Sequence, residues 1–247
     1  MKLLKKLFLS LKMSEQLEDL ICDLSQENKK SISLTANNSS WIELSFLPKK
    51  LMEYGAQQFD RLFNMHPDEK HNIISKEGEN MQVFRWQKSY GKTPEYDKSD
   101  EYFKTHFYMY SGLDTSKNND VLPELFAPFF EYIKSIDERY NQVVINWYDS
   151  DDHIAFHRDC QRNMMVDVPI LVLTLTLASE ESLRNFDIIP FELNPESVEL
   201  LYKNVSIPSK HGMLLKMCGE FQTEFRHGIK QKLNSGKRIS VSFRAFE

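Results

Sequence analysis

The stretch Asn146-Trp-Tyr-Asp-Ser-Asp-Asp-His-Ile-Ala-Phe-His-Arg-Asp159 decides the fold of this chain. Together with the Val143-Val-Ile that precedes it, the first part predicts a strand that puts Asn146 and Tyr148 on one face and apolar side chains on the other. His157 and Asp159 are two residues apart, so on a following strand both side chains point to the same face. Two neighbouring strands would therefore present polar groups that can converge.

A second patterned strand lies near the end of the chain, at Arg238-Ile-Ser-Val-Ser-Phe-Arg244. Its arginines and serines fall on one face, and its three apolar residues fall on the other. The apolar face belongs in a core. The polar face either meets water or lines the mouth of a barrel, where a guanidinium group can grip a carboxylate with two hydrogen bonds.

Three side chains, His157, Asp159 and His227, predict a metal centre when they are taken together. Two imidazoles and one carboxylate can hold Fe(II) and leave coordination positions open. Each motif alone is more often an ordinary hydrogen-bonded group. Because His227 follows Asp159 by 68 residues (227 − 159), only the fold can bring the three together.

Composition describes an ordinary globular chain of 247 residues, with 41% hydrophobic and 27% charged residues and a net charge of −5. A large nucleic-acid scaffold would be basic, so any contact with nucleic acid must use a local patch. The three cysteines form no zinc or disulfide pattern, and we expect an intracellular protein, cytoplasmic or nuclear. No apolar run is long enough to predict a transmembrane segment.

The chain divides into an N-terminal helical extension and linker, residues 1–39, and one domain, residues 40–247. The extension has leucines at helical spacing that would pack on the domain, or alternatively bind a membrane surface or a partner. Within the domain, helices are expected near 48–64 and 122–140, and short strands after that. The predicted strands cover residues 143–148, 154–157, 170–177, 185–189, 212–217, 224–227 and 239–244. Two helices followed by many strands indicate an α+β architecture.

The ordered set of motifs resembles the AlkB family of Fe(II)- and 2-oxoglutarate-dependent dioxygenases. The motifs are Asn146-x-Tyr148, His157-x-Asp159, Pro169-Ile170 before a strand, His211-Gly-Met-Leu-Leu-Lys-Met217, Phe225-Arg-His227 and Arg238-Ile-Ser-Val-Ser-Phe-Arg244. The resemblance covers about residues 40–246. It implies a double-stranded β-helix, or jelly-roll, core with supporting N-terminal helices.

The resemblance also implies a role for each matched residue. His157, Asp159 and His227 would be the catalytic iron ligands. Arg238 would pair with the distal carboxylate of 2-oxoglutarate, and Arg244 would help to hold the carboxylate that chelates iron. Asn146 and Tyr148 would donate hydrogen bonds to the same cosubstrate.

The substrate is the less determined part of the resemblance. Tyr90, Tyr108 and Arg184 match positions near the family's substrate pocket. Cys160, Gln161 and Arg162 stand where repair members carry acidic residues. We expect a monomer that uses O2 and 2-oxoglutarate to demethylate N-alkylated nucleobases in DNA or RNA, releasing formaldehyde, succinate and CO2. A protein or small-molecule substrate for the same cofactors, and a jelly-roll that binds without turnover, remain the alternatives. The basic segment 210–247 is the predicted phosphate-contacting rim.

Overall fold

A computed structural model describes residues 29–74, 80–92, 120–161, 163–191 and 199–247. In these residues, antiparallel strands form one large sheet, one small sheet and a separate pair, β3 (Asn72–Ile74) with β4 (Asn80–Gln82). The large sheet runs in the order β1 (Lys30–Ser33), β2 (Ser40–Phe46), β11 (Met213–Gly219), β8 (Ile170–Thr176), β13 (Arg238–Arg244), β6 (Gln142–Tyr148) and β5 (Trp86–Gly91). The small sheet runs β10 (Val205–Pro208), β9 (Asn185–Pro190), β12 (Phe225–Ile229) and β7 (Ile154–His157).

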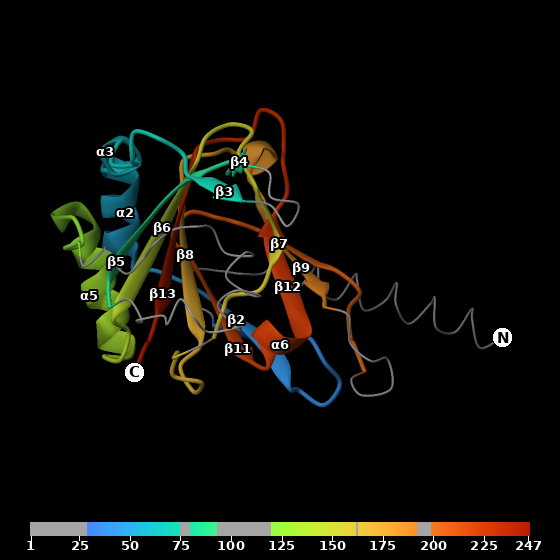
Figure 1. Cartoon of the computed structure of the whole chain (residues 1–247). Helices are drawn as coiled ribbons and strands as arrows, with labels where there is room; N and C mark the ends of the chain where they lie inside the picture. Colours follow the sequence, from blue (N-terminus) through green and yellow to red (C-terminus); the bar gives the residue numbers. More distant parts are fainter. Residues whose placement is uncertain (1–28, 75–79, 93–119, 162, 192–198) are drawn as a thin grey trace.

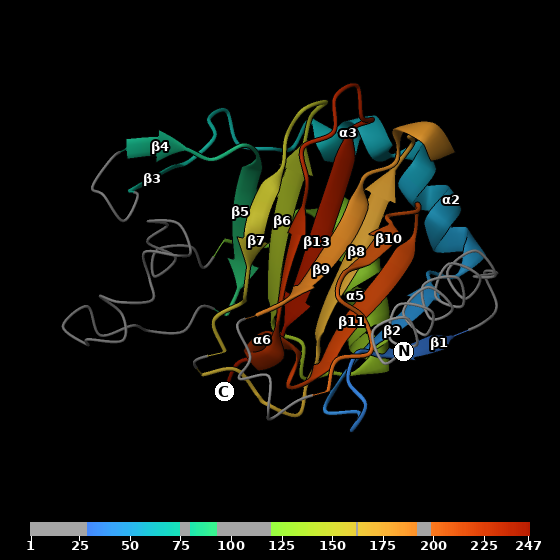
Figure 2. The same cartoon turned by 90° about the vertical axis from the view of Figure 1, so that its right-hand side faces the viewer.

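The two sheets face each other, and helices cover the other face of the large sheet (Figure 1). These helices are α2 (Lys49–Gln57), α3 (Phe59–Phe63), the 3-10 turn η3 (Glu124–Phe126) and α5 (Ala127–Ile136). Two shorter helices, η4 (Glu180–Ser182) and α6 (Phe221–Glu224), connect strands. Figure 2 shows the small sheet in front of the large one. The result is the predicted jelly-roll core with supporting helices, an α+β fold.

The central strands of the large sheet are buried on both faces, which explains their composition. All seven residues of β8, Ile170-Leu-Val-Leu-Thr-Leu-Thr176, are buried, and so are all seven of β6. A strand covered on both sides reads as a continuous apolar run, whereas a strand with one wet face alternates with polar residues. β13 lies between β8 and β6, so its arginine- and serine-bearing face is enclosed by the small sheet.

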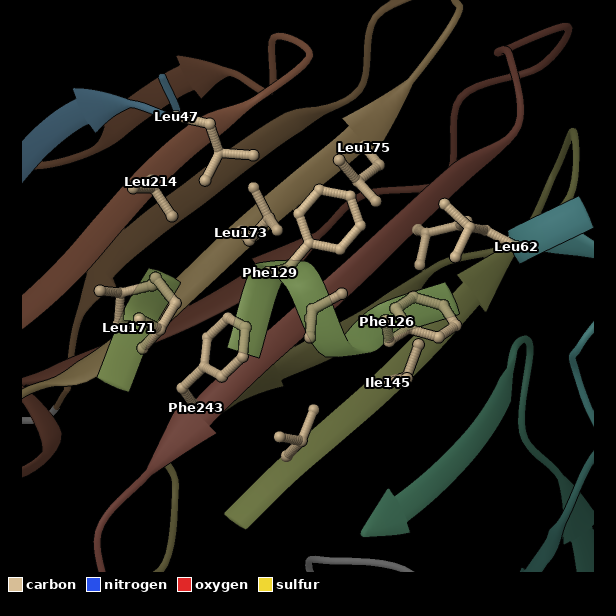
Figure 3. Packing of buried hydrophobic residues seen from close by; sticks show 14 of the residues in the cluster. Leu47, Leu62, Phe126, Phe129, Ile145, Leu171, Leu173, Leu175, Leu214 and Phe243 are labelled. Atoms are coloured by element: carbon tan, nitrogen blue, oxygen red, sulfur yellow. The ribbon is translucent and has the colours of Figure 1, made fainter. Parts of the chain in front are cut away.

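Apolar side chains fill two layers, one on each face of the large sheet. In the first layer, Phe126 and Phe129 from the helical segment pack onto Leu173 and Phe243 of the sheet (Figure 3). The second layer lies between the sheets and includes Phe186. Trp147 anchors α3 as well, because its indole N–H donates a hydrogen bond of 2.9 Å to the carbonyl of Leu62.

The predicted strands at 143–148, 154–157, 170–177, 185–189, 212–217, 224–227 and 239–244 are present within one or two residues of their expected bounds. The predicted linker differs from the structure, because residues 30–33 form β1 and pair with β2. Strand β10 and the β3–β4 pair are not among the predicted strands. Residues 1–28, where the helical extension was predicted, lie outside the described residues. Among the described helices, none combines the length and apolar character needed to cross a bilayer.

Replacement of Phe129 by Ala tests the packing of α5 on the large sheet. The ring is fully buried among the residues of the first layer, so the substitution leaves a cavity that backbone shifts close only in part. We expect the free energy of unfolding to fall by about 3–5 kcal/mol in chemical denaturation. Val121→Ala, at a highly exposed position, should stay within about 0.5 kcal/mol of the wild type. A loss below about 1 kcal/mol at Phe129 would contradict this packing.

Candidate functional site

The three side chains predicted to bind metal meet between the two sheets. His157 ends β7, Asp159 follows two residues later, and His227 lies at the centre of β12. One potential ligand atom from each residue lies within 4.8 Å of the others. His227 is 6% exposed, and its ring stacks at 5.3 Å on Phe186. The fold therefore brings together the three donors that the sequence separates by 68 positions.

A β-bulge aims His157 at this centre. His227 pairs with His157 and Ile229 pairs with Ile154, so β12 advances two residues while β7 advances three. The extra residue lets both Ile154 and His157 line the pocket, although an unbroken strand would send them to opposite faces. The imidazole Nδ1–H of His157 donates a hydrogen bond of 2.8 Å to the carbonyl of Ala155, which directs Nε2 towards the other two ligands.

Gly228 makes this bulge possible. A Cβ atom at this position would lie 2.9 Å from the carbonyl oxygen of Ile154 and 3.2 Å from the backbone of Phe156. These obstacles are main-chain atoms of β7, which cannot turn aside as a side chain can. Glycine at position 228 therefore permits the close approach of the two strands that carry the histidines.

Both imidazoles are held in the neutral form that metal ions require. Burial lowers the pKa of His227 to about 3, and the neighbouring His157 contributes to the same shift. Burial also lowers the pKa of His157, against the opposing effect of Asp159. A neutral imidazole has a lone pair to offer, so the two rings need not release protons at neutral pH to accept a metal ion.

Asp159 is fixed from two sides. Its backbone N–H donates to Oε1 of Gln222 at 2.8 Å, and its carboxylate accepts a hydrogen bond from Nη2 of Arg244 at 2.8 Å. The Gln222 amide is in turn 3.3 Å from the sulfur of Met217. These contacts orient the carboxylate towards His227, whose Nε2 lies 3.9 Å away. Arg244 lines the pocket as predicted for a cosubstrate residue, but its guanidinium donates to Asp159 and, at 3.4 Å, to Oε1 of Gln142.

Arg238 is a buried cation with unused donors. The residue is 2% exposed, and Nη2 donates to Oγ1 of Thr174 at 3.1 Å. Its Nε and Nη1 atoms are buried without a hydrogen-bond partner, and burial lowers the pKa of the guanidinium to about 10. Unpaired buried N–H groups cost free energy that an incoming carboxylate would recover. This arrangement fits the distal carboxylate of 2-oxoglutarate.

The remaining predicted cosubstrate residues line the same pocket. Asn146 and Tyr148 project from β6 beside Arg238, and the Tyr148 ring lies 5.3 Å from the guanidinium carbon. Arg85 donates from Nε to Oδ1 of Asn146 at 2.9 Å, which leaves the amide NH2 of Asn146 as its donor. Arg85, Arg238 and Arg244 thus oppose the single carboxylate of Asp159. This excess of positive charge suits a dianion such as 2-oxoglutarate, and the triad suits Fe(II).

The three predicted substrate residues are placed differently. Tyr90 lies in the first core layer, on the face of the sheet away from the pocket, and burial raises its pKa to about 12. Arg184 is buried, and its guanidinium donates to the carbonyls of Asp149, Ser150 and Asp152. Arg184 therefore stabilises the turn between β6 and β7. Neither Arg184 nor Tyr90 lines the pocket. Tyr108 lies outside the described residues.

Three residues that hold the predicted site residues in place were not predicted from the sequence: Arg85, Gln222 and Gly228. Each acts on a predicted residue through the tertiary fold, since Arg85 binds Asn146, Gln222 binds Asp159, and Gly228 admits the bulge before His157. The only local signal was the glycine directly after His227, because glycine within a strand often marks a bulge or a close approach.

The model of the 2OG-Fe(II) oxygenase superfamily matches residues 45–244, and the chain belongs to this family. The family uses Fe(II) and 2-oxoglutarate, so the chain is a dioxygenase, and the predicted cofactors agree with the triad in the structure. The chain is AlkB-like. It is 27% identical to the alpha-ketoglutarate-dependent dioxygenase alkB homolog 3 of Mus musculus over 142 residues, which are 56% of this chain and 47% of that protein.

The homologue of the same name from Rattus norvegicus is also 27% identical, over 56% of this chain and 46% of its own length. The chain thus matches about half the length of these curated relatives. Among solved structures, OsALKBH1 aligns with a TM-score of 0.47 and 13% identity, over 82% of this chain and 97% of that one. A 2OG-Fe(II) oxygenase family oxidoreductase from Burkholderia pseudomallei aligns with a TM-score of 0.42 and 13% identity, over 82% and 84%.

Replacement of Gly228 by Ala should weaken metal binding, because the added methyl group pushes β7 and His157 away from Asp159 and His227. We expect the affinity for Co(II), followed by its visible absorption, to fall about tenfold or more, as for other residues that support metal ligands. Gly55→Ala is the matched control, since its Cβ would lie nearest to side-chain atoms of Leu175 and His211 and would not press on a strand that carries a metal ligand.

Circular dichroism of both variants will show whether the fold is retained before metal is added. A folded Gly228→Ala protein with wild-type affinity for Co(II) would mean that the bulge does not position His157.

Proposed function

We propose that this dioxygenase oxidatively demethylates N-alkylated nucleobases in DNA or RNA. Fe(II) held by His157, Asp159 and His227, with 2-oxoglutarate and O2, supplies the oxidising chemistry that hydroxylates a methyl C–H bond. The hydroxymethyl group on nitrogen then leaves as formaldehyde, and 2-oxoglutarate leaves as succinate and CO2. The alkB homologues are named as alpha-ketoglutarate-dependent dioxygenases, and this name and the chemistry of the pocket support the oxidative part of the reaction.

In this proposal the protein's own contribution is geometry and charge. Arg238 orients the cosubstrate by pairing two donors with its distal carboxylate, and Asn146 and Tyr148 add hydrogen bonds along its length. Arg244 keeps the carboxylate of Asp159 in place. The apolar residues Ile154 and Phe186 of the pocket wall exclude water around the reacting atoms.

The observation that favours a nucleobase is an exposed aromatic pair beside the pocket. Phe84 is 53% exposed, and its ring stacks on that of His153 at 4.3 Å with an angle of 20°. The backbone N–H of His153 also donates to the carbonyl of Phe84 at 3.0 Å, which fixes the pair. The next residue, Arg85, lines the pocket. A planar base can stack on such a platform before its methyl group reaches the metal.

Release of succinate from 2-oxoglutarate tests the proposal. We expect turnover to rise when single-stranded DNA or RNA carries N-methylated bases, with formaldehyde formed in equal amount, and to stay at the uncoupled rate with the same unmethylated sequence. A panel of methylated peptides serves as the comparison. Stimulation by peptides and not by nucleic acids would overturn the nucleobase assignment, and would favour the protein substrate that the net charge of −5 also allows.

Arg238→Lys tests the assignment of the cosubstrate. Lysine keeps the positive charge but loses the planar fork that binds a carboxylate with two N–H groups. We expect the KM for 2-oxoglutarate to rise about tenfold to a hundredfold, as for the loss of one hydrogen bond between charged groups, worth about 1.5–3 kcal/mol. Substrate affinity should remain near that of the wild type.

Arg139→Lys is the matched control, because Arg139 pairs with Asp137 and Asp167 at the surface and none of the three lines the pocket. An unchanged KM for 2-oxoglutarate in Arg238→Lys would remove Arg238 from the cosubstrate site.

A further inference from the structure

Two arginines stand directly behind the metal-binding triad, on the outer face of the small sheet. Arg158 lies between His157 and Asp159 in the chain, and Arg226 directly precedes His227. Because side chains alternate along a strand, the ligands point into the pocket and their arginine neighbours point outward. Both guanidinium groups gather at one ring, since their central carbons lie 3.8 Å and 4.9 Å from the centroid of Phe191.

The charge of these two groups is not neutralised within the part of the chain that the structure describes. No carboxylate there forms an ion pair with Arg158 or Arg226, and the Nε atom of Arg226 is buried without a hydrogen-bond partner. Stacking on Phe191 covers the flat faces of the guanidinium groups and leaves their N–H edges as donors. Two like charges held this close favour binding of an anion with several oxygen atoms, which can accept from both.

A third cation, Lys230, also lies beside an aromatic ring on this face. Nζ of Lys230 lies 5.8 Å from the ring of Phe156, and Lys230 is 65% exposed. One carboxylate faces this group: Asp187 is 3.5 Å from Lys230 and also accepts a hydrogen bond from Ser206. Among the described residues of this face, three cations against one carboxylate give a local charge of +2 (3 − 1), in a chain whose net charge is −5.

The predicted rim at 210–247 includes Arg226 and Lys230 of this outer face, and its other lysines are less suitable for phosphate. Within that segment, Lys210 and Lys216 pair with carboxylates, and Lys232 donates to two backbone carbonyls. Lys237 lies over the ring of Phe63. These four lysines thus have local partners, whereas the guanidinium groups of Arg158 and Arg226 face the ring of Phe191 and no carboxylate among the described residues.

The position of β7 connects the outer face with the pocket. β7 is the end strand of the small sheet in the order β10-β9-β12-β7 (Figure 2). The triad therefore lies just inside one edge of this sheet, and the two arginines lie just outside the same edge. A polymer that inserts one unit into the pocket can pass around this edge and place a neighbouring unit on the outer face.

We propose that Arg158 and Arg226, stacked on Phe191, form a binding site for a backbone phosphate of single-stranded nucleic acid. The bound phosphate belongs to the same strand whose methylated base enters the pocket, so the inference rests on the function proposed above. The N–H edges of the guanidinium groups donate to the phosphate oxygens, and the half-buried rings of Phe156 and Phe191 lie beside the cations of this face.

The test is salt-dependent binding of a single-stranded oligonucleotide of about twelve nucleotides with one N-methylated adenine. In Arg158→Gln/Arg226→Gln, we expect affinity at low salt to fall about tenfold or more, and the slope of log affinity against log salt to flatten by about 0.7, the value for one lost phosphate contact. Lys49→Gln/Lys50→Gln removes the same charge at exposed positions of α2 and should behave as wild type.

A charge-preserving variant separates phosphate binding from a structural effect. Arg158→Lys/Arg226→Lys loses the stacked guanidinium groups but keeps two point charges, so its salt slope should stay close to that of the wild type. Thermal unfolding and Co(II) binding will be measured for each variant. Equal loss of affinity in the Gln and Lys pairs, together with lower stability, would overturn the inference and assign both arginines a structural role.

Turnover of a methylated nucleoside, which has no phosphate, distinguishes failure of this inference from failure of the proposed function. If the wild type binds the oligonucleotide through the two arginines but demethylates neither substrate, the phosphate site stands and the proposed function fails. If the wild type demethylates both substrates and the Gln pair keeps the wild-type affinity and slope, the function stands and the phosphate site is wrong. Absence of oligonucleotide binding by the wild type would also overturn the phosphate site.

Discussion

The burial of β13 on both faces is the constraint on which this structure depends. Its apolar face, Ile239, Val241 and Phe243, packs under the helices, so the opposite face cannot turn to solvent. The guanidinium of Arg238 is therefore enclosed between the sheets, with one hydrogen bond to Thr174 and two nitrogen atoms unsatisfied. Burying a charge in this way lowers stability, and a site that binds an anion recovers the loss.

Most strands could be predicted from the sequence, because their residues either alternate between apolar and polar or form continuous apolar runs. Strand β13 and the buried β8 were predicted from this pattern within one residue. In contrast, β1 and β10 are short strands at the two sheet edges, Lys30-Ser-Ile-Ser33 and Val205-Ser-Ile-Pro208, in polar surroundings. Their pairing with β2 and β9 comes from tertiary contact, which a window of sequence does not contain.

The site also combines residues that a local sequence pattern reveals with residues that only tertiary contact brings into place. The triad and the pocket face of β13 follow from motif order and strand alternation, so the sequence predicts them. The residues that position the triad act through contacts with other strands or helices, so the sequence around each ligand does not reveal them. Gly228 can be read from the sequence, but the need for glycine there arises from the extra residue of β7, whose backbone lies close to position 228. Arg184 depends on the fold in a similar way: the resemblance predicts a residue near the substrate pocket, and in the structure its guanidinium donates to carbonyls of the turn at 149–152.

Alternation also divides the small sheet into two chemically different faces. Each metal-ligand candidate on β7 and β12 has an arginine as its chain neighbour, so the inner face collects imidazoles and a carboxylate while the outer face collects guanidinium groups. A single period of two residues thus places a metal centre and a cationic surface back to back. This arrangement lets a chain of overall negative charge present positive charge where a polyanion would approach its active site.

The central claim is that the triad and Arg238 hold a metal ion and 2-oxoglutarate together. Calorimetric titration of 2-oxoglutarate without oxygen, in the presence and absence of Fe(II), tests this claim most directly, with glutarate as the comparison ligand. Glutarate keeps both carboxylates but lacks the keto oxygen that completes chelation of a metal. The account predicts that Fe(II) raises the affinity for 2-oxoglutarate at least about tenfold, or about 1.4 kcal/mol, and leaves that for glutarate nearly unchanged. Equal affinity for 2-oxoglutarate with and without Fe(II) would contradict it.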